Sequence, residues 1–264
     1  MTFQRAELLS VKLLSMTIGA IKSTQSMSNF LEVSVLYGSA LGSIVDVRSG
    51  AGNDIISVEG GSVNVDSGDG NDVIDVYAIH ANIDGGSGDD NLTSYTSSAN
   101  LSGGSGDDKI NVISTGAGVN VKGGTGNDTI YLDNGKAFGG ARNDHITVNS
   151  LNHKPISQLG FTFADSSHKE PVLTVTPIWP VLNGGTGDDN FSLVNNARAV
   201  FEYNSGDGHD TIKGATENSF LKLGPGLTFE QTTFSIQDGT LLSPLMDRKD
   251  RLLFRILKNK DWRH

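Results

Sequence analysis

Cysteine is absent from this chain of 264 residues, so disulfide bonds and thiol catalysis are both excluded. Aromatic residues make up only 7% of the sequence, and there are six prolines. No apolar run approaches the roughly 18 residues that a membrane-spanning helix needs, so no transmembrane span is expected. The length suits one repeat domain with end caps, which must be held together by something other than disulfides.

The sequence also lacks the common signatures of catalysis. It contains no H-E-x-x-H motif of a zinc protease and no G-x-S-x-G nucleophile elbow. The six histidines have no spacing typical of metal ligands, and His145 and His209 fall inside glycine-rich turns. We therefore expect no enzyme activity from this chain. Acidic residues outnumber basic ones by 30 to 20, for a net charge of −10, and no nucleic-acid partner is expected.

Glycine, in contrast, is abundant, with 33 residues, and much of it belongs to a nine-residue pattern that recurs eight times. The clearest copies are GGSGDDNLT at 85–93, GGSGDDKIN at 103–111, GGTGNDTIY at 123–131 and GGTGDDNFS at 184–192. Looser copies begin at Ser49, Ser67, Gly139 and Ser205. The starts at 49, 67, 85 and 103 are 18 residues apart, which is twice the motif length. Such regular repetition predicts a stacked repeat architecture.

The pattern G-G-x-G-x-D-x-U-x, in which U is a large apolar residue, resembles the nonapeptide repeat of the repeats-in-toxin (haemolysin-type) family. The resemblance covers about residues 44–214, and the stretch from FEYNSGDGHDTI through LKLGPGLTFEQTTF resembles the segment that closes many such domains. It implies an all-β fold, a parallel β-roll that forms a right-handed β-solenoid with calcium held between stacked turns. It also implies secretion from a bacterium by type I machinery.

The residue types of the repeat suit calcium on chemical grounds as well. Glycines at the first, second and fourth motif positions allow φ > 0 and a sharp turn that points carbonyl oxygens inward. Calcium takes six to eight oxygens at about 2.3–2.6 Å, more than one turn supplies, so we expect each ion to lie between successive turns. The predicted metal residues are the sixth-position aspartates Asp54, Asp72, Asp90, Asp108, Asp128, Asp144, Asp189 and Asp210, with the backbone of Gly50, Gly68, Gly86, Gly104, Gly124, Gly140, Gly185 and Gly206.

Only one of the two turns in each 18-residue coil carries the motif, which predicts one file of ions along one edge. Six consecutive turns give five intervals, and the turns at 184 and 205 add one or two, so about five to seven calcium ions are expected. Aspartates on coils about 4.8 Å apart repel by roughly 1 kcal/mol in water and by several at an effective dielectric near 20. We therefore expect calcium to drive folding. The alternative is that the aspartates only cap turns by hydrogen bonding.

Apolar residues recur at three positions of each coil and alternate with polar ones, which predicts two short strands per coil with one buried face. The column two residues before each turn is Val47, Val65, Ile83, Leu101, Val121, Ala137, Leu182 and Tyr203. The column at the eighth motif position is Ile56, Ile74, Leu92, Ile110, Ile130, Ile146, Phe191 and Ile212. Asn64, Asn82, Asn100 and Asn120 face outward, either as a hydrogen-bonded ladder or as part of a binding surface.

Three segments fall outside the regular repeat. We expect residues 1–43 to form an N-terminal cap with a strand at 31–35, and 215–264 to form a C-terminal cap. For the tail of this second cap, the family resemblance suggests an export segment, and the alternative is a solvated cap without that role. Residues 148–183 interrupt the roll at 44–214 as an excursion loop with a strand at 172–179, a degenerate coil, or a recognition loop. A further departure is Arg142, which stands where the fourth glycine should be and weakens the case for a metal there.

Three functions remain after these observations. The favoured one is a secreted, extracellular calcium-binding repeat protein that stands alone or forms part of a toxin or adhesin. The second is the non-catalytic calcium-binding module of an extracellular enzyme such as a protease, lipase or alginate epimerase. The third is a surface adhesin that binds a glycan or host protein through the 148–183 insertion.

Overall fold

The computed structural model describes residues 44–149, 179–215 and 219–228, together with the backbone of short strands at 10–14, 21–24, 32–36, 240–246 and 252–258. All of the regular structure in these ranges is β-strand, and the strands join in one sheet. The described residues contain no helix, and therefore none that is long and apolar enough to cross a membrane.

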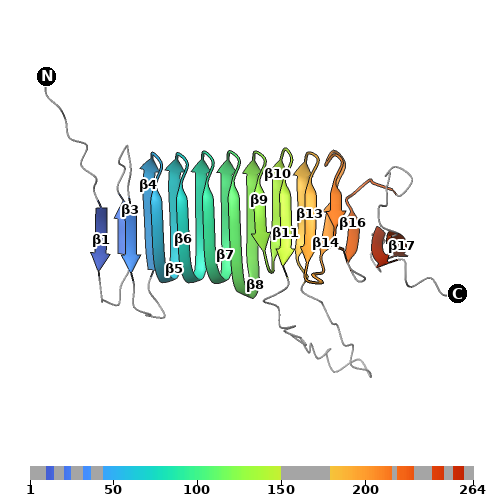
Figure 1. The fold of residues 1–264 in the computed structure, drawn as a ribbon, viewed down its shortest axis with the longest axis horizontal. Coiled ribbons are helices and arrows are strands. Elements are labelled where there is room, and N and C mark those ends of the chain that lie inside the picture. The colour runs from blue at the N-terminus through green and yellow to red at the C-terminus, as the bar shows by residue number, and fades with distance from the viewer. Residues whose placement is uncertain are drawn as a thin grey trace, which may run out of the picture.

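The central stack is a parallel β-solenoid of about eight turns, whose coils lie side by side in a row (Figure 1). Its strands are β4 (Ile44–Ala51), β5 (Ile55–Asp69), β6 (Val73–Ser87), β7 (Asn91–Ser105), β8 (Lys109–Thr125), β9 (Thr129–Leu132), β10 (Lys136–Ala141), β11 (His145–Asn149), β12 (Val181–Thr186), β13 (Asn190–Val194), β14 (Val200–Tyr203), β15 (Thr211–Lys213) and β16 (Phe220–Leu223). Each pairs in parallel with the strand one coil away, as β5 does with β6 and β6 with β7. The predicted all-β solenoid is confirmed.

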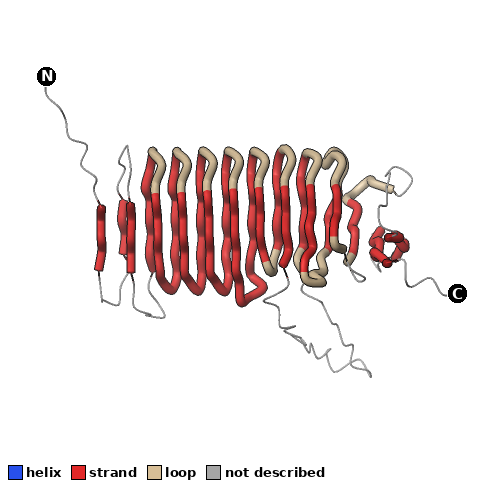
Figure 2. The backbone as a smooth tube through the Cα atoms, viewed as in Figure 1, coloured by secondary structure: helices blue, strands red, loops and turns tan. Residues whose placement is uncertain are grey.

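The pairing register brings equivalent motif positions next to each other. Gly86 lies opposite Gly104, Gly104 opposite Gly124, and Gly124 opposite Gly140. The glycine-rich turns therefore follow one edge of the stack, where Figure 2 shows them in tan. With this register, side chains at equivalent positions of neighbouring coils lie next to each other, apart from a shift between Thr96 and Ser98 where β7 pairs with β8.

The core is a set of apolar columns that run along the inside of the solenoid. Of the three predicted columns, the two listed above are buried over most of their length: Ile74, Leu92 and Ile110 are each 0% exposed. Only Tyr203 and Ile212, near the C-terminal end, are partly buried. A further column that the sequence analysis did not identify is also buried: Val58, Val76, Ser94, Val112, Leu132, Val148 and Leu193.

The turn opposite the glycine-rich edge differs from the prediction of two short strands joined by a turn. In the N-terminal coils, β5, β6 and β7 each run for 15 residues straight through this bend. Ladder pairing continues through it, with Glu59 opposite Tyr77 and Gly60 opposite Ala78. From β9 onward the two flanks are separate strands. The bend therefore takes part in strand pairing in half of the stack. Its small and polar residues had indicated a turn without strand pairing.

The stack continues without a break across the predicted insertion. β10 pairs with β12 and β11 with β13, so Ala137 lies opposite Leu182 and Ile146 opposite Phe191. The ends of the 148–183 segment belong to the stack, since β11 reaches Asn149 and β12 begins at Val181. Residues 150–178, with most of the strand expected at 172–179, lie outside the described residues.

The two ends of the sheet differ in strand direction. At the N-terminal end, β1 (Ser10–Leu14), β2 (Ile21–Thr24) and β3 (Glu32–Leu36) extend the parallel pairing, because β2 pairs with β4 and β3 with β5. The strand expected at 31–35 is thus present as β3. At the other end, β17 (Thr240–Met246) and β18 (Leu252–Lys258) form an antiparallel pair, and β18 runs antiparallel to β16.

The inward columns should dominate the stability of the stack. We expect Ile74→Ala to cost about 2–5 kcal/mol, because Ile74 is fully buried and its loss leaves a cavity. The matched control is Val73→Ala on the outer face, where 40% of Val73 is exposed, and the expected cost is below about 1 kcal/mol. Chemical denaturation of both variants in the same buffer tests this, and equal midpoint shifts would contradict the assignment of inner and outer faces.

Candidate metal centre

The glycine-rich turns depend on backbone conformations that other residues rarely adopt. The second-position glycines have φ between 95° and 126°, and the fourth-position glycines between 102° and 146°. Neighbouring coils also approach closely there: a Cβ added to Gly104 would lie less than 3.0 Å from the carbonyl oxygen of Gly86. The prediction of positive φ is confirmed at these two positions.

The first-position glycines serve a different purpose, and the prediction of positive φ is wrong for them. The positive-φ residues of the described chain do not include Gly85, Gly103, Gly123, Gly139 or Gly184. A Cβ added to any of the five would instead lie less than 3.0 Å from the carboxylate oxygen Oδ2 of the aspartate in the same turn. Glycine is needed here for space beside the carboxylate rather than for a left-handed backbone.

The structure brings the eight predicted aspartates together in one column. Seven of them are buried, with 1–2% exposure, and Asp210 in the last turn is partly buried. In each of the last seven aspartates, one carboxylate oxygen, Oδ1, accepts the backbone N–H of the aspartate in the preceding coil at 2.7–3.2 Å. One oxygen of each carboxylate therefore ties two coils together.

The other oxygen, Oδ2, has no such partner. In Asp90, Asp108, Asp128, Asp144 and Asp189 it is buried and accepts no hydrogen bond. Beside the first-position glycines at 85, 103, 123 and 139, this oxygen and the first-position carbonyl oxygen of the next turn both lie less than 3.0 Å from the point where a Cβ would sit. Two acceptors thus lie close together without a donor between them, an unfavourable arrangement that a bound cation or a proton would relieve.

Burial gives these carboxyl groups unusual acidities. The pKa of Asp108 is raised to about 7, mainly by burial. The neighbouring carboxylates of Asp128 and Asp90 contribute to this rise, and the hydrogen bond from the Asp90 N–H opposes it. The pKa of Asp144 is likewise raised by burial to about 7, and that of Asp90 to about 6. Burial also raises the pKa of Asp72. Without a bound cation, the column therefore resists ionisation.

The donor set favours a hard cation. No three histidine, cysteine, aspartate or glutamate side chains gather into a metal-type cluster within the described parts of the chain. Any ion in this column would be held by carboxylate oxygens completed by backbone carbonyls, which suits calcium and not zinc.

The eight turns stack consecutively, because Asp144 donates its N–H to Asp189 and Asp189 donates to Asp210, so there are seven intervals between turns.

Arg142 occupies the fourth position of its turn with φ of 86°, in the left-handed region that strains a residue with a side chain. The turn still closes, since the Arg142 N–H donates to the Thr186 carbonyl at 2.7 Å. Arg142 thus adopts the positive φ that glycine has at this position in the other turns. The Arg142 side chain is exposed, so the turn keeps the shape of its neighbours despite the substitution.

A second ladder, next to the aspartate column, escaped the sequence analysis. The fifth motif position is asparagine or aspartate in the first seven turns. Its side-chain oxygen accepts the backbone N–H of the equivalent residue in the following coil, as Asn53 does from Asn71 at 2.8 Å and Asp89 from Asp107 at 2.8 Å. This ladder is exposed and runs opposite in sense to the buried one. The recurrence of Asn or Asp at that position was the available signal.

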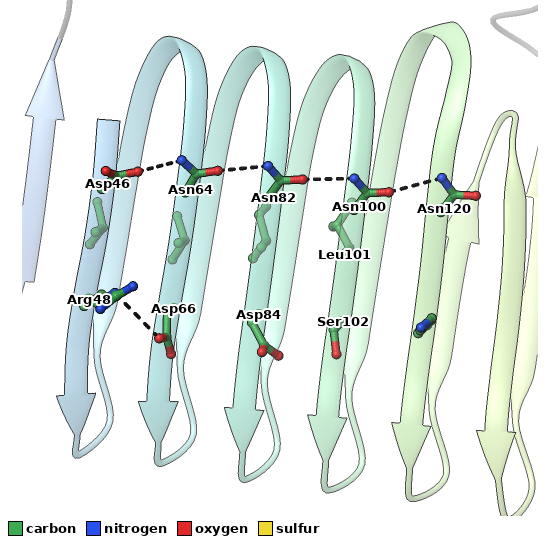
Figure 3. Close-up of a pocket in the computed structure, with 14 residues that line it drawn as sticks. Asp46, Arg48, Asn64, Asp66, Asn82, Asp84, Asn100, Leu101, Ser102 and Asn120 are labelled. Atoms are coloured by element: carbon green, nitrogen blue, oxygen red, sulfur yellow. Dashed lines mark hydrogen bonds and ion pairs between the residues drawn. The ribbon is translucent and has the colours of Figure 1, made fainter. Parts of the chain in front are cut away.

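The outward asparagines form the ladder that was one of the two predicted alternatives (Figure 3). Asn82 donates to Asn64 at 2.9 Å, Asn100 to Asn82 at 2.9 Å and Asn120 to Asn100 at 3.1 Å. A shallow groove of about 690 Å³ lies beside the ladder, along β4 to β8. One donor of each amide is used within the ladder, which stabilises the register of the coils.

Comparison of the chain with protein-family models, curated proteins and solved structures finds no match. The likeness to the repeats-in-toxin family therefore rests on the repeated motif, and the structure adds to it a parallel β-solenoid with the motif in register.

The raised pKa values predict how the metal-free protein responds to pH. A folded-state pKa near 7 for Asp108 and Asp144, against 3.8 ordinarily, means that the folded chain binds protons that the unfolded chain has released. This stabilisation is present at low pH and is lost as the pH rises towards 7. In chelator, the melting temperature should therefore rise as the pH is lowered from about 7.5 to about 5.5.

With saturating calcium the trend should reverse, since protons then compete with the ion for the same oxygens. Thermal denaturation followed by circular dichroism measures both trends. A metal-free protein that loses stability over this acidification would contradict the account of the column.

Proposed function

We propose that this protein is a calcium-binding repeat protein in which ions between successive glycine-rich turns hold the coils together. The observation that carries the proposal is the row of buried Oδ2 atoms that accept no hydrogen bond and face backbone carbonyls. A divalent ion would attract both oxygens at once and remove the repulsion between them.

The ligands would come from two turns at a time. In the interval that begins at Gly103, the donors would include Oδ2 of Asp108 and the carbonyl oxygen of Gly123, both of which face the same point. Calcium tolerates six to eight oxygens in flexible geometry, so it accommodates carbonyls and a carboxylate from separate segments. Magnesium requires a near-ideal octahedron and retains its waters, so it suits this arrangement less well.

We further propose that the protein belongs to the repeats-in-toxin class and is secreted by type I machinery into a calcium-rich exterior. What supports this is the regularity of the motif over eight copies together with the in-register parallel stack. The absence of cysteine in the sequence is consistent with ions, rather than disulfides, as cross-links. The same sites would serve a stand-alone protein, part of a toxin or adhesin, or the non-catalytic module of an extracellular enzyme.

The substitution Asp108→Asn, compared with Asp107→Asn, tests the proposal. Each carboxylate accepts a backbone N–H through Oδ1, from Asp90 at 2.9 Å and from Asn127 at 2.7 Å respectively, and an amide keeps that acceptor. Only Asp108 is buried with a second oxygen that has no donor. Asp108→Asn should therefore lower the apparent calcium affinity roughly tenfold or more, and Asp107→Asn should change it little.

Circular dichroism during a calcium titration is the measurement. The unmodified protein should gain β signal in the sub-millimolar to millimolar range, and magnesium should produce little change. In chelator near pH 7.5, Asp108→Asn should raise the melting temperature because it removes a buried charge. Equal effects of the two substitutions on the calcium response would contradict the proposal.

A further inference from the structure

The first motif position differs between the turns that begin the seven intervals. It is serine in the two turns at the N-terminal end, Ser49 and Ser67, and glycine in the next five, while Ser205 in the eighth turn begins no interval. Both serines are 0% exposed. Because a first-position Cβ would enter the space beside the aspartate Oδ2, the serines occupy a space that the glycines leave open.

The serine hydroxyls bridge neighbouring coils. Ser49 Oγ donates to the carbonyl oxygen of Ser67 at 2.8 Å, and Ser67 Oγ donates to the carbonyl oxygen of Gly85 at 2.7 Å. These are the first-position carbonyls, equivalent to those that face Oδ2 in the glycine turns. In the serine turns, a hydroxyl proton therefore meets the oxygen that would otherwise be available to an ion.

The contrast with the glycine turns is local. Oδ2 of Asp72 accepts no hydrogen bond of ordinary geometry either. The Ser67 hydroxyl nevertheless lowers the pKa of Asp72 against the larger effect of burial, so the serine also interacts with the carboxylate. Ser67 fills the space beside Oδ2 of Asp72, and its hydroxyl occupies a lone pair of the Gly85 carbonyl oxygen. In the turn that begins at Gly123, the space beside Oδ2 of Asp128 stays open and the Gly139 carbonyl oxygen meets no serine hydroxyl. An ion with six to eight ligands would lose one ligand and its room at each serine turn.

We propose that calcium binds only in the five intervals that begin with a glycine, and that serine hydroxyls close the first two intervals in its place. This inference rests on the proposed calcium function and specifies where it operates. The five intervals begin at Gly85, Gly103, Gly123, Gly139 and Gly184.

The serine coils would then form a platform whose folding does not depend on calcium. Their inward columns are apolar, with Val45, Val63, Ile56 and Val58 each at 0–1% exposure, and the buried Ser49 and Ser67 hydroxyls add hydrogen bonds between the coils. In a solenoid each coil is stabilised mainly by its neighbours, so an ion-independent end supplies a template on which ion-dependent coils stack. Removing calcium should open residues 85–210 and leave the coils of 44–84 in place.

Counting bound calcium by equilibrium dialysis tests the inference. The unmodified protein should bind five ions, and the double substitution Ser49→Gly with Ser67→Gly should raise the number by two. Gly85→Ser should lower the number of bound ions by one. The fold accommodates a serine at this motif position, as Ser67 shows one coil earlier. A matched control is Ser105→Gly at the exposed third position of a turn, which should leave the number unchanged.

A double variant that binds no more ions than the unmodified protein would overturn the inference while leaving the proposed function intact. A protein that binds no calcium at all would instead overturn the proposed function. Hydrogen exchange in chelator provides a second measurement: protection should persist in residues 44–84 and fall in 85–210. Equal loss of protection in both ranges would also overturn the inference.

Discussion

A buried carboxylate oxygen with no hydrogen-bond donor is the feature on which the rest of the structure depends. In-register parallel stacking places residues of equivalent position one coil apart, so the side chains of each column must be compatible with one another. Isoleucine and valine columns gain apolar contacts. The asparagine column satisfies itself, because an amide both donates and accepts. An ionised aspartate side chain can only accept hydrogen bonds, so stacked aspartates cannot satisfy one another's carboxylate oxygens.

The surrounding turn preserves this arrangement. Positive-φ glycines at the second and fourth positions let backbones of adjacent coils meet closely, and the first-position glycine keeps the space beside Oδ2 open. Oδ1 is used for a coil-to-coil hydrogen bond, which holds the carboxylate in one orientation. The pKa of Asp108, raised by burial to about 7, reflects the same unfavourable burial of charge. A cation that joins Oδ2 to the next carbonyl would convert this unfavourable column into cross-links.

Much of this was accessible from the sequence because a period of 18 fixes which residues meet. The parallel solenoid, the aspartate column and the inward position of Ile74 follow from that period. The role of the first-position glycine could not be predicted from this period. A positive φ and a lack of space for a side chain both favour glycine, and only the coordinates distinguish the two causes. The ladder at Asn53 and Asn71 and the buried column at Val58 were missed because neither needs a rare residue type. The opposite bend was misjudged since ladder pairing continues through small residues such as Gly60.

The most direct test of the central claim is a crystal structure of the protein grown in calcium, with anomalous scattering used to locate the ions. The account predicts a file of anomalous peaks along the glycine-rich edge. Each peak should lie between two turns and within about 2.3–2.6 Å of an aspartate Oδ2. An edge without such peaks, in which Oδ2 of Asp108 is instead protonated and hydrogen-bonded to the carbonyl of Gly123, would contradict it.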